Sequence, residues 1–364
     1  MKQGWEIRPF EKCIEKVKYT TKIATCDYST MGAYPVVSQE EEYISGYWNN
    51  AEDVFKVSKP VVIFGDHTRV LKYVDFDFVL GADGVKILQP IDAINAKFFL
   101  YYLIASNIPS LGYSRHYKLL KELNVPVPPI AEQEKIVAEL DCLSGIIEKK
   151  KQQLKELDAL AQSIFYEMFG DPVENDKRWD VKRIEDICDV YRGGSPRPID
   201  KFLGGNIPWI KIGDATLGDS IFLTQTKEHI IEEGLRKTRF IHSGSLIFAN
   251  CGGSLGFARI ITFDGCIHDG WLAFDNVSEE IDKIFFLKSL NFCTPYFRSI
   301  APDGVQPNLN TSIMKAFKQI LPPLSMQKDY VDKIQAIEKQ ELLVTESLVQ
   351  AEMLLNSRMD YYFN

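Results

Sequence analysis

The chain repeats one short segment at a spacing of 194 residues. Val127-Pro128-Pro129-Ile130 with Gln133 returns as Leu321-Pro322-Pro323-Leu324 with Gln327, and a phenylalanine stands forty residues after the second proline of each copy. Solenoid units run ~20–50 residues, so this period indicates a duplicated domain followed by a duplicated connector. We therefore predict four segments, at residues 1–129, 130–170, 171–322 and 323–364.

Both connectors are predicted to be long helices. Residues 130–169 hold no proline and one glycine, and Gly170-Asp171-Pro172 is a stop signal for a helix. Apolar residues follow a seven-residue repeat in both connectors, in the same phase, as in a coiled-coil seam. The predicted seam consists of Leu140, Leu143, Ile147, Leu154 and Leu157 in the first helix and Ile334, Ile337, Val344, Leu348 and Leu355 in the second; Lys150, Glu341 and Arg358 interrupt it.

Two ways of burying these seams are open. Each helix could pack on its own domain, or the two helices could pack on each other, which their equal length and phase favour. Because a large domain separates them in sequence, a short loop cannot return the chain to a parallel start. We expect an antiparallel pair, with the two domains related by a pseudo-twofold axis and held apart by a rod of roughly 50 Å.

The two large domains share a framework and differ in their loops. The matching framework segments are Trp5 with Trp179, 62–64 with 246–248, 83–84 with 269–270, and 98–100 with 285–287. They read as short strands plus one helix, which predicts an α+β protein built from two similar mixed α/β domains joined by an antiparallel coiled coil. Diverged loops on a common framework are typical of two domains that recognise different targets.

Composition excludes several classes of protein. The net charge of −8 argues against a histone-like DNA binder, although not against a site-specific one. No apolar run is long enough to span a membrane, and the first residues do not resemble a secretory signal. The seven scattered cysteines suit a reducing cytoplasm, and the five histidines share no ligand spacing with them, so no metal site is expected.

Motifs for catalysis are missing from the sequence. There is no G-x-x-x-x-G-K-S/T phosphate loop, no G-x-S-x-G, no H-E-x-x-H and no Asp/Asn-Pro-Pro-Tyr/Phe of the amino-methyltransferases. We therefore expect a chain that is not itself an enzyme.

The chain resembles the specificity subunits of type I restriction-modification systems over nearly its whole length. The resemblance rests on V-P-P-I-A-E-Q-E-K-I-V at 127–137 and its repeat at 321–331, on Gly194-Ser195-Pro196 followed by I-P-W-I at 207–210, and on the segment 304–323. The first domain departs from the family pattern, because it lacks the G-S/T-P opening and reads Y-S-R-H-Y at 113–117 in place of Gln-Pro-Asn.

The resemblance implies a division of labour. Each large domain would be a target-recognition domain that reads one half of a bipartite, asymmetric site in double-stranded DNA. The helices would fix the gap and dock two methyltransferase subunits, and through them the restriction and translocation subunits. Methyl transfer from S-adenosylmethionine to adenine N6 would occur on the partner, and this chain would hold no cofactor.

Candidate DNA-reading residues are polar side chains expected on exposed loops. In the first domain they are Ser38, Gln39, Asn49, Asn50, Arg69, Arg115 and His116; in the second they are Arg192, Ser195, Arg197, Lys211, Asn250, Arg259, Gln306 and Asn308. Arg236, Lys237 and Arg239 are expected to contact phosphates, because no amide side chain lies beside them.

Two other functions remain open from the sequence. One is a coiled-coil adaptor that bridges two protein partners without reading DNA. The other is a DNA methyltransferase or nuclease with cryptic motifs, which would turn over substrate without a partner subunit.

Overall fold

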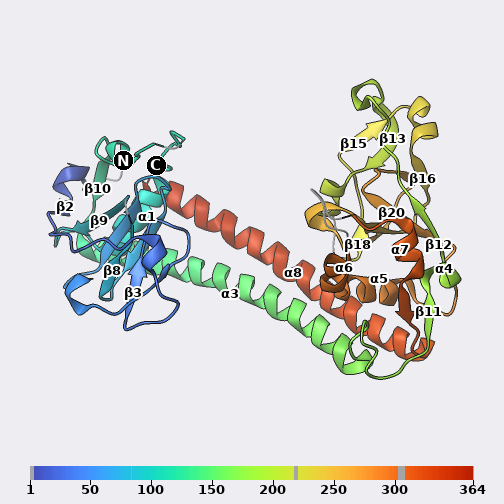
Figure 1. The fold of residues 1–364 in the computed structure, drawn as a ribbon. Helices are drawn as coiled ribbons and strands as arrows, with labels where there is room; N and C mark the ends of the chain where they lie inside the picture. The colour runs from blue at the N-terminus through green and yellow to red at the C-terminus, as the bar shows by residue number, and fades with distance from the viewer. Residues whose placement is uncertain (1–3, 83, 113, 217–219, 302–307, 364) are drawn as a thin grey trace. The chain divides into compact units, whose positions relative to one another are not determined.

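The computed structural model describes residues 4–82, 84–112, 114–216, 220–301 and 308–363. The chain divides into two compact units, the first formed by Met1–Lys150 with Ser347–Asn364 and the second by Lys151–Glu346 (Figure 1). Each unit holds one large domain together with part of each long helix. The four-segment division drawn from the sequence stays a prediction.

The first unit contains a mixed α/β domain whose first and last strands pair with each other. Its elements are β1 (Glu6–Pro9), β2 (Ile14–Glu15), β3 (Tyr34–Val37), β4 (Gly46–Trp48), β5 (Val54–Phe55), β6 (Val61–Gly65), β7 (Leu71–Val74), β8 (Phe78–Leu80), β9 (Val85–Pro90), α1 (Ala96–Ala105), α2 (Tyr117–Leu120) and β10 (Asn124–Val127). They form two four-stranded sheets, β2-β9-β6-β7 and β4-β3-β8-β5. The antiparallel pair β1–β10 joins the first strand of the domain to the last.

The second unit repeats this plan. Its elements are β11 (Val181–Arg183), α4 (Ile184–Ile187), β12 (Asp189–Arg192), β13 (Leu203–Ile210), β14 (Phe222–Leu223), β15 (Glu228–Ile230), β16 (Arg239–Ile241), β17 (Leu246–Ala249), β18 (Ala258–Ile261), β19 (Gly265–Ile267), β20 (Trp271–Asp275), α5 (Lys283–Phe292), α6 (Thr294–Ile300), α7 (Thr311–Ala316) and β21 (Lys318–Ile320). The sheets β12-β20-β17-β18-β14 and β15-β13-β19-β16 match those of the first unit, and β11–β21 matches β1–β10.

Two helices of 40 residues follow the closing strands, α3 (Ile130–Phe169) and α8 (Leu324–Phe363). In both repeats the glutamine after the proline pair has no exposed surface. The side chain of Gln133 accepts a hydrogen bond from the backbone N–H of Asn95 (2.8 Å) and donates to Ala93 O and Pro128 O. Gln327 makes the same three bonds in the second unit, with Asp282 N, Glu280 O and Pro322 O.

The residues that these glutamines accept from are the N-caps of α1 and α5. Asn95 Oδ1 accepts from the backbone N–H of Lys97 and Phe98, and Asp282 Oδ1 accepts from those of Ile284 and Phe285. A buried amide that makes all these bonds fixes the start of the long helix relative to the domain helix. The repeated glutamine of the sequence is therefore a structural clamp.

The long helices run antiparallel, as contacts inside each unit establish. In the first unit Glu139, near the start of α3, contacts Arg358 and Tyr362, near the end of α8. In the second unit Phe165, near the end of α3, packs against Tyr330, near the start of α8, with ring centroids 5.5 Å apart. Both helices also join the cores of the large domains, so packing on a domain and pairing with the other helix occur together.

The seam positions of both helices are buried or partly buried. Leu140, Ile147, Ile334, Ile337 and Val344 are at most 8% exposed. The other five, Leu143, Leu154, Leu157, Leu348 and Leu355, are partly buried.

Two of the seam interruptions make polar contacts between the helices. Arg358 donates to Glu139 of α3 in the first unit. Glu341 is held against Asp158 of α3 in the second. A polar side chain inside an apolar seam favours one alignment of two helices over others.

Burial raises the pKa of Glu341 to about 7, and the carboxylates of Glu338 and Asp158 add to the effect while Lys288 opposes it. A carboxyl whose pKa is higher in the folded state binds more protons there than in the unfolded chain. Stability is therefore lost as pH rises from about 4.5, the ordinary value, to about 7.

We predict that Glu341→Gln stabilises the protein at pH 8 and has little effect near pH 5. The amide removes the ionised carboxyl, and a gain of about 1 kcal/mol corresponds to ~2–4 °C in the unfolding midpoint of a unit this size. Thermal unfolding at the two pH values measures the difference. Glu346→Gln, at an exposed site of the same helix, serves as the control. An equal gain for Glu341→Gln at both pH values would refute the account.

Candidate nucleic-acid interface

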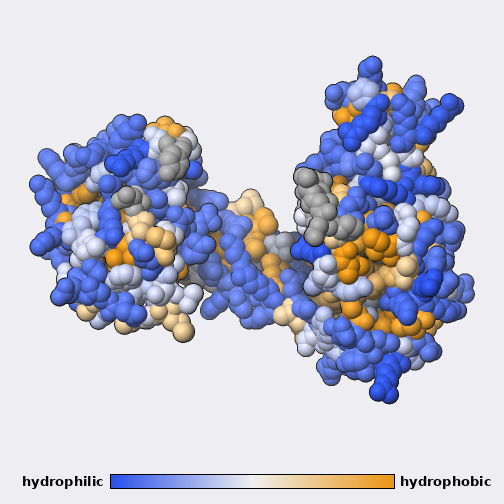
Figure 2. Space-filling model, in the orientation of Figure 1, coloured by the Kyte–Doolittle hydropathy of each residue, from blue (hydrophilic) through white to orange (hydrophobic). Residues whose placement is uncertain are grey.

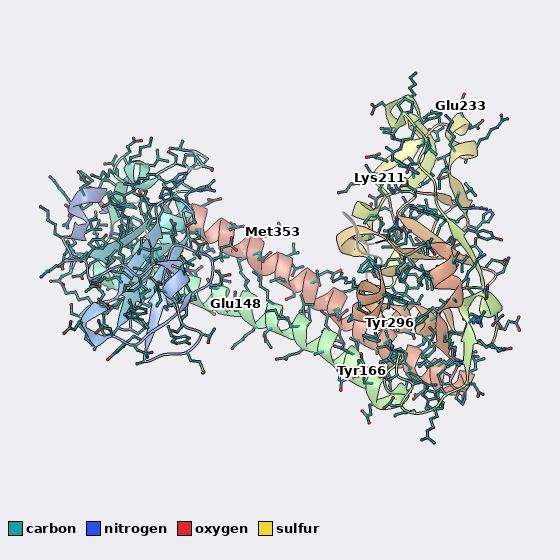
Figure 3. All side chains as sticks on the ribbon, viewed as in Figure 1. Glu148, Tyr166, Lys211, Glu233, Tyr296 and Met353 are labelled. Carbon is teal, nitrogen blue, oxygen red and sulfur yellow. The ribbon has the colours of Figure 1, made fainter. Side chains whose placement is uncertain are left out.

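A cluster of cationic side chains lies at strand ends of the second unit. Arg192 ends β12, Lys211 follows β13, and Arg197 belongs to the loop between these strands. All three act electrostatically on the imidazole of His268, which precedes β20. Figure 3 labels Lys211 at its place beside β13.

The loop that carries Arg192 and Arg197 needs its two glycines. A Cβ on Gly193 would lie 2.1 Å from His268 O, and one on Gly194 would lie 2.5 Å from Lys237 O. No side chain fits at such distances, so only glycine allows this close approach. The sequence R-G-G-S-P-R is thereby pressed against the segment around residue 268.

Asp269 ties the loop in place. Its backbone oxygen accepts from Arg192 Nε (3.0 Å), and its carboxylate accepts from Ser195 Oγ (2.8 Å). The Nδ1 atom of the neighbouring His268 lies 3.0 Å from the backbone N of Gly270 and 3.0 Å from Asp269 Oδ1, so it can accept a hydrogen bond from the amide or, when protonated, donate one to the carboxylate. Burial lowers the pKa of His268, and Arg197, Lys211 and Arg192 lower it further against the opposing effect of Asp269.

A buried aromatic side chain, Trp209 at 3% exposure, packs beside His268. The ring of Trp209 lies 5.5 Å from that of His268, and Lys211 Nζ stands 5.8 Å from the Trp209 ring centre. Lys211 also pairs with Glu228. Fixed cations beside an imidazole suit a negatively charged ligand with hydrogen-bond acceptors, such as duplex DNA.

The three residues predicted to contact phosphates are all exposed. Lys237 Nζ lies 4.5 Å from the ring centre of Phe202, and the guanidinium of Arg239 lies 4.4 Å from that of Tyr191. These contacts hold two of the charges in place while leaving them accessible to solvent. Gly194 connects this cationic group to the Arg192 loop through its approach to Lys237.

Four candidates are buried, which corrects the expectation from the sequence. His116 has no exposed surface; its Nδ1–H donates to Asp66 O (2.9 Å), and its Nε2 accepts from Leu111 N (2.9 Å). Asn250 is equally buried and donates to Asn308 Oδ1 and Leu309 O, both at 3.1 Å. These side chains connect loops inside the domain.

Ser38 and Arg259 are the other two. Ser38 is 3% exposed and its hydroxyl lies 2.7 Å from that of Ser45. Arg259 is 7% exposed, stacks on Phe257 at 3.6 Å and donates to Ala258 O. Neither side chain can reach a base edge without a rearrangement of the domain, and sequence alone does not distinguish a buried polar residue from an exposed one.

Other candidates of the first unit shape loops or lie at the surface. Asn49 accepts from Ala33 N, and Asn50 caps a short turn at Ala51–Asp53. Gln39 accepts from the backbone N–H of His67 (3.3 Å) and, through its own carbonyl, from Thr68 Oγ1. Arg69, with φ of 64°, donates to Ile108 O (2.9 Å). Arg115 is exposed and Asn308 half-buried; Gln306 lies outside the described residues.

Asp66, which was not a candidate, and Asn250, which was one, occupy matching places in the two units. Asp66 and Asn250 follow matching strands, β6 and β17, and each N–H donates to a matching glycine carbonyl, of Gly84 and Gly270. In the first unit Asp66 also accepts from the backbone N–H of Tyr117 (2.7 Å). The D-G pairs at 83–84 and 269–270 were the available signal, since they recur in the repeat.

Neither a metal centre nor a transmembrane helix is found in the described part of the chain. No three histidine, cysteine or acidic side chains gather there as metal ligands would. No helix there is both long and apolar enough to span a bilayer.

Comparison with known proteins identifies relatives over most of the chain. The family model "Type I restriction modification DNA specificity domain" matches residues 2–159 and 176–352. The specificity subunit of the Escherichia coli type I restriction enzyme EcoR124I/EcoR124II is 28% identical over 257 residues, which cover 66% of this chain and 61% of that subunit. The alignment thus spans less than two thirds of that relative.

Two further matches span nearly the whole chain. The specificity subunit of the type I restriction enzyme MjaVIII from Methanocaldococcus jannaschii is 21% identical, with 92% of this chain and 86% of the relative covered. A crystal structure of the type I restriction-modification S subunit from M. genitalium superposes with a TM-score of 0.62 at 15% identity, covering 98% of this chain and 95% of that one. The structural match confirms the predicted fold class.

We predict that replacing Arg236, Lys237 and Arg239 by alanine weakens binding of the full chain to random-sequence duplex DNA and flattens its salt dependence. Each lost phosphate contact reduces the slope of log K against log salt by ~0.9. Alanine at Lys182, Arg183 and Lys318, which are exposed on the two-stranded sheet β11–β21, removes the same charge and should leave the slope nearly unchanged. Equal slopes for the two triple variants would show that only net charge matters.

Proposed function

This chain belongs to the family of type I restriction modification DNA specificity domains, and on that premise we propose that it is the DNA-specificity subunit of a type I restriction-modification complex. Each large domain reads one half of a bipartite, asymmetric site in double-stranded DNA. The chain acts in the cytoplasm and performs no chemistry itself.

The observation that carries this proposal is one framework that presents two different loop sets. The sheets of the two units match strand for strand, with β14 as the extra strand of the second. After the matching strands β13 and β3, however, the second unit presents Lys211 and the first presents Gln39, and the loop before each strand reads R-G-G-S-P-R at 192–197 in the second unit and T-M-G-A at 30–33 in the first. Different donors and acceptors on the same scaffold favour recognition of two different base sequences.

The helices set the spacing between the two half-sites that the domains read. Each helix begins at a buried glutamine clamp and pairs with its antiparallel partner in both units. A paired helix is stiffer than a flexible linker, so it favours one separation of the half-sites.

Catalysis belongs to partner subunits in this proposal. Two methyltransferase subunits bind S-adenosylmethionine and methylate adenine N6, and restriction subunits with translocase activity join the complex through them. The relatives named above are specificity subunits, which gives no support to the adaptor or to the cryptic methyltransferase or nuclease considered from the sequence.

An exposed apolar face of α8 is the proposed docking surface for a methyltransferase subunit. In the first unit Val349 is 49% exposed and Met353 is 67% exposed. Successive residues of a helix are ~100° apart, so these two share one side, which faces away from the seam residue Leu355. Figure 2 shows apolar atoms among the polar surface of the helices, and Figure 3 labels Met353. A helix face of this kind suits an apolar protein partner.

Exchange of residues 1–129 for the corresponding domain of another family member tests the proposed function. In complex with methyltransferase subunits, the chimaera should methylate a site of which only one half has changed, because the second domain and the helices are retained. Sequencing of methylated adenines measures this. Changes in both halves, or in neither, would contradict separate reading by two domains.

For the docking surface we predict that Met353→Glu weakens binding of the cognate methyltransferase subunit ~10-fold or more, since a charge would replace a buried apolar contact. The residue is largely exposed in the free chain, so the fold should be unaffected. Gln350→Glu adds the same charge at another exposed site of α8 and is expected to bind like the parent chain. Titration of each variant with the methyltransferase subunit measures the two affinities. Equal affinities would place the docking surface elsewhere.

A further inference from the structure

The same two positions touch in both units, at the place where a domain helix meets a long helix. Tyr101 is the sixth residue of α1, and Lys288 is the sixth residue of α5. Ser144 and Glu338 are both the fifteenth residue of their long helices. Tyr101 contacts Ser144 in the first unit, and Lys288 contacts Glu338 in the second. The duplicated framework therefore preserves this contact although all the side chains differ.

In the first unit the contact is a hydroxyl pair with a carboxylate beside it. Tyr101 Oη lies 3.2 Å from Ser144 Oγ and donates to Asp141 Oδ1 at 2.8 Å. Lys97, one turn earlier on α1, donates to the same carboxylate at 2.6 Å. The ion pair of this interface is Lys97–Asp141, and its side chains are 38% and 35% exposed.

In the second unit the ion pair occupies the contact itself. Lys288 Nζ lies 2.5 Å from Glu338 Oε1 and donates to Ser220 Oγ at 2.7 Å, and the Ser220 hydroxyl donates to Glu338. Both charged side chains are only 10% exposed. The positions that match Lys97 and Asp141 are Ile284 and Gln335, which cannot form an ion pair.

Because Lys288 and Glu338 are buried, combining a residue of one pair with a residue of the other would lower the stability of the fold. A lysine or glutamate held out of water is tolerated only with an opposite charge and hydrogen-bond partners, so removing one partner destabilises strongly. A hydroxyl pair needs no charge. Glu338 opposite a tyrosine would leave a buried carboxylate without its counterion, and Lys288 opposite a serine would lose the carboxylate that it contacts directly and keep only its electrostatic interaction with Glu341.

We propose that the residues at these two matched positions, Tyr101 with Ser144 and Lys288 with Glu338, form a pairing code that makes each large domain specific for its own long helix. The pairs favour the correct partner and penalise the wrong one, which is how specificity arises between two similar interfaces. These residues determine which domain packs on which long helix. A domain transferred from another chain should pack stably on the long helix when its residue at the matched position complements the residue of that helix.

A double-substitution cycle in the full chain tests the code. Lys288→Tyr and Glu338→Ser are made singly and together; the double variant reproduces the hydroxyl pair of the first unit. Each single change should lower the midpoint of thermal unfolding by roughly 5 °C or more. The double variant should recover at least half of the larger of the two losses, because no buried charge is then left unpaired.

The reciprocal cycle, Tyr101→Lys with Ser144→Glu, examines the first unit. Its single changes are expected to be milder, because Asp141 can partner a lysine there. The exposed ion pair Lys182–Glu280, whose side chains are 43% and 57% exposed, is the control, and its alanine variants should shift the midpoint by less than ~2 °C.

Every outcome of the Lys288–Glu338 cycle is decisive. If a single variant fails to fold while the double variant folds, the code is supported. If the two losses simply add, or the double variant also fails to fold, or the single variants match the parent, the proposal is overturned. The measurement uses no DNA, so it fails or succeeds independently of the proposed function.

Discussion

A buried glutamine amide at the start of each long helix is the constraint on which the rest of the structure depends. Gln133 and Gln327 each join three backbone groups: the N-cap of the domain helix, the segment just before it, and the first proline of the proline pair. An amide without exposed surface is stable only when these bonds are made. Each clamp therefore fixes the direction in which a 40-residue helix leaves its domain.

Because their directions are fixed, the two long helices pair with each other in one arrangement. Apolar residues occupy most of the seam positions and are buried or partly buried, while the few polar positions favour one alignment. Arg358 with Glu139 in the first unit and Glu341 beside Asp158 in the second bind the helices to each other. Tyr101 and Lys288 bind the domains to the helices.

The sequence predicted the repeat, the helices and the fold class, because these depend on patterns that local physics enforces. The proline pair and the seven-residue spacing indicate where each helix starts and which face it buries. Burial of single polar residues follows no such pattern. His116 and Asn250 have the chemistry of base readers, yet both are enclosed by loops that come from distant parts of the sequence. His268 and Asp269 organise the second surface only because Gly193 allows a close approach.

The most direct test of the account is binding of the assembled complex to duplexes in which the gap between the two half-sites is varied one base pair at a time. Each added base pair moves one half-site by ~3.4 Å and rotates it by roughly 34°. Domains clamped to paired helices should bind tightly at a single gap length and lose affinity steeply on either side. Equal affinity over several successive gap lengths would contradict a spacing fixed by the helices.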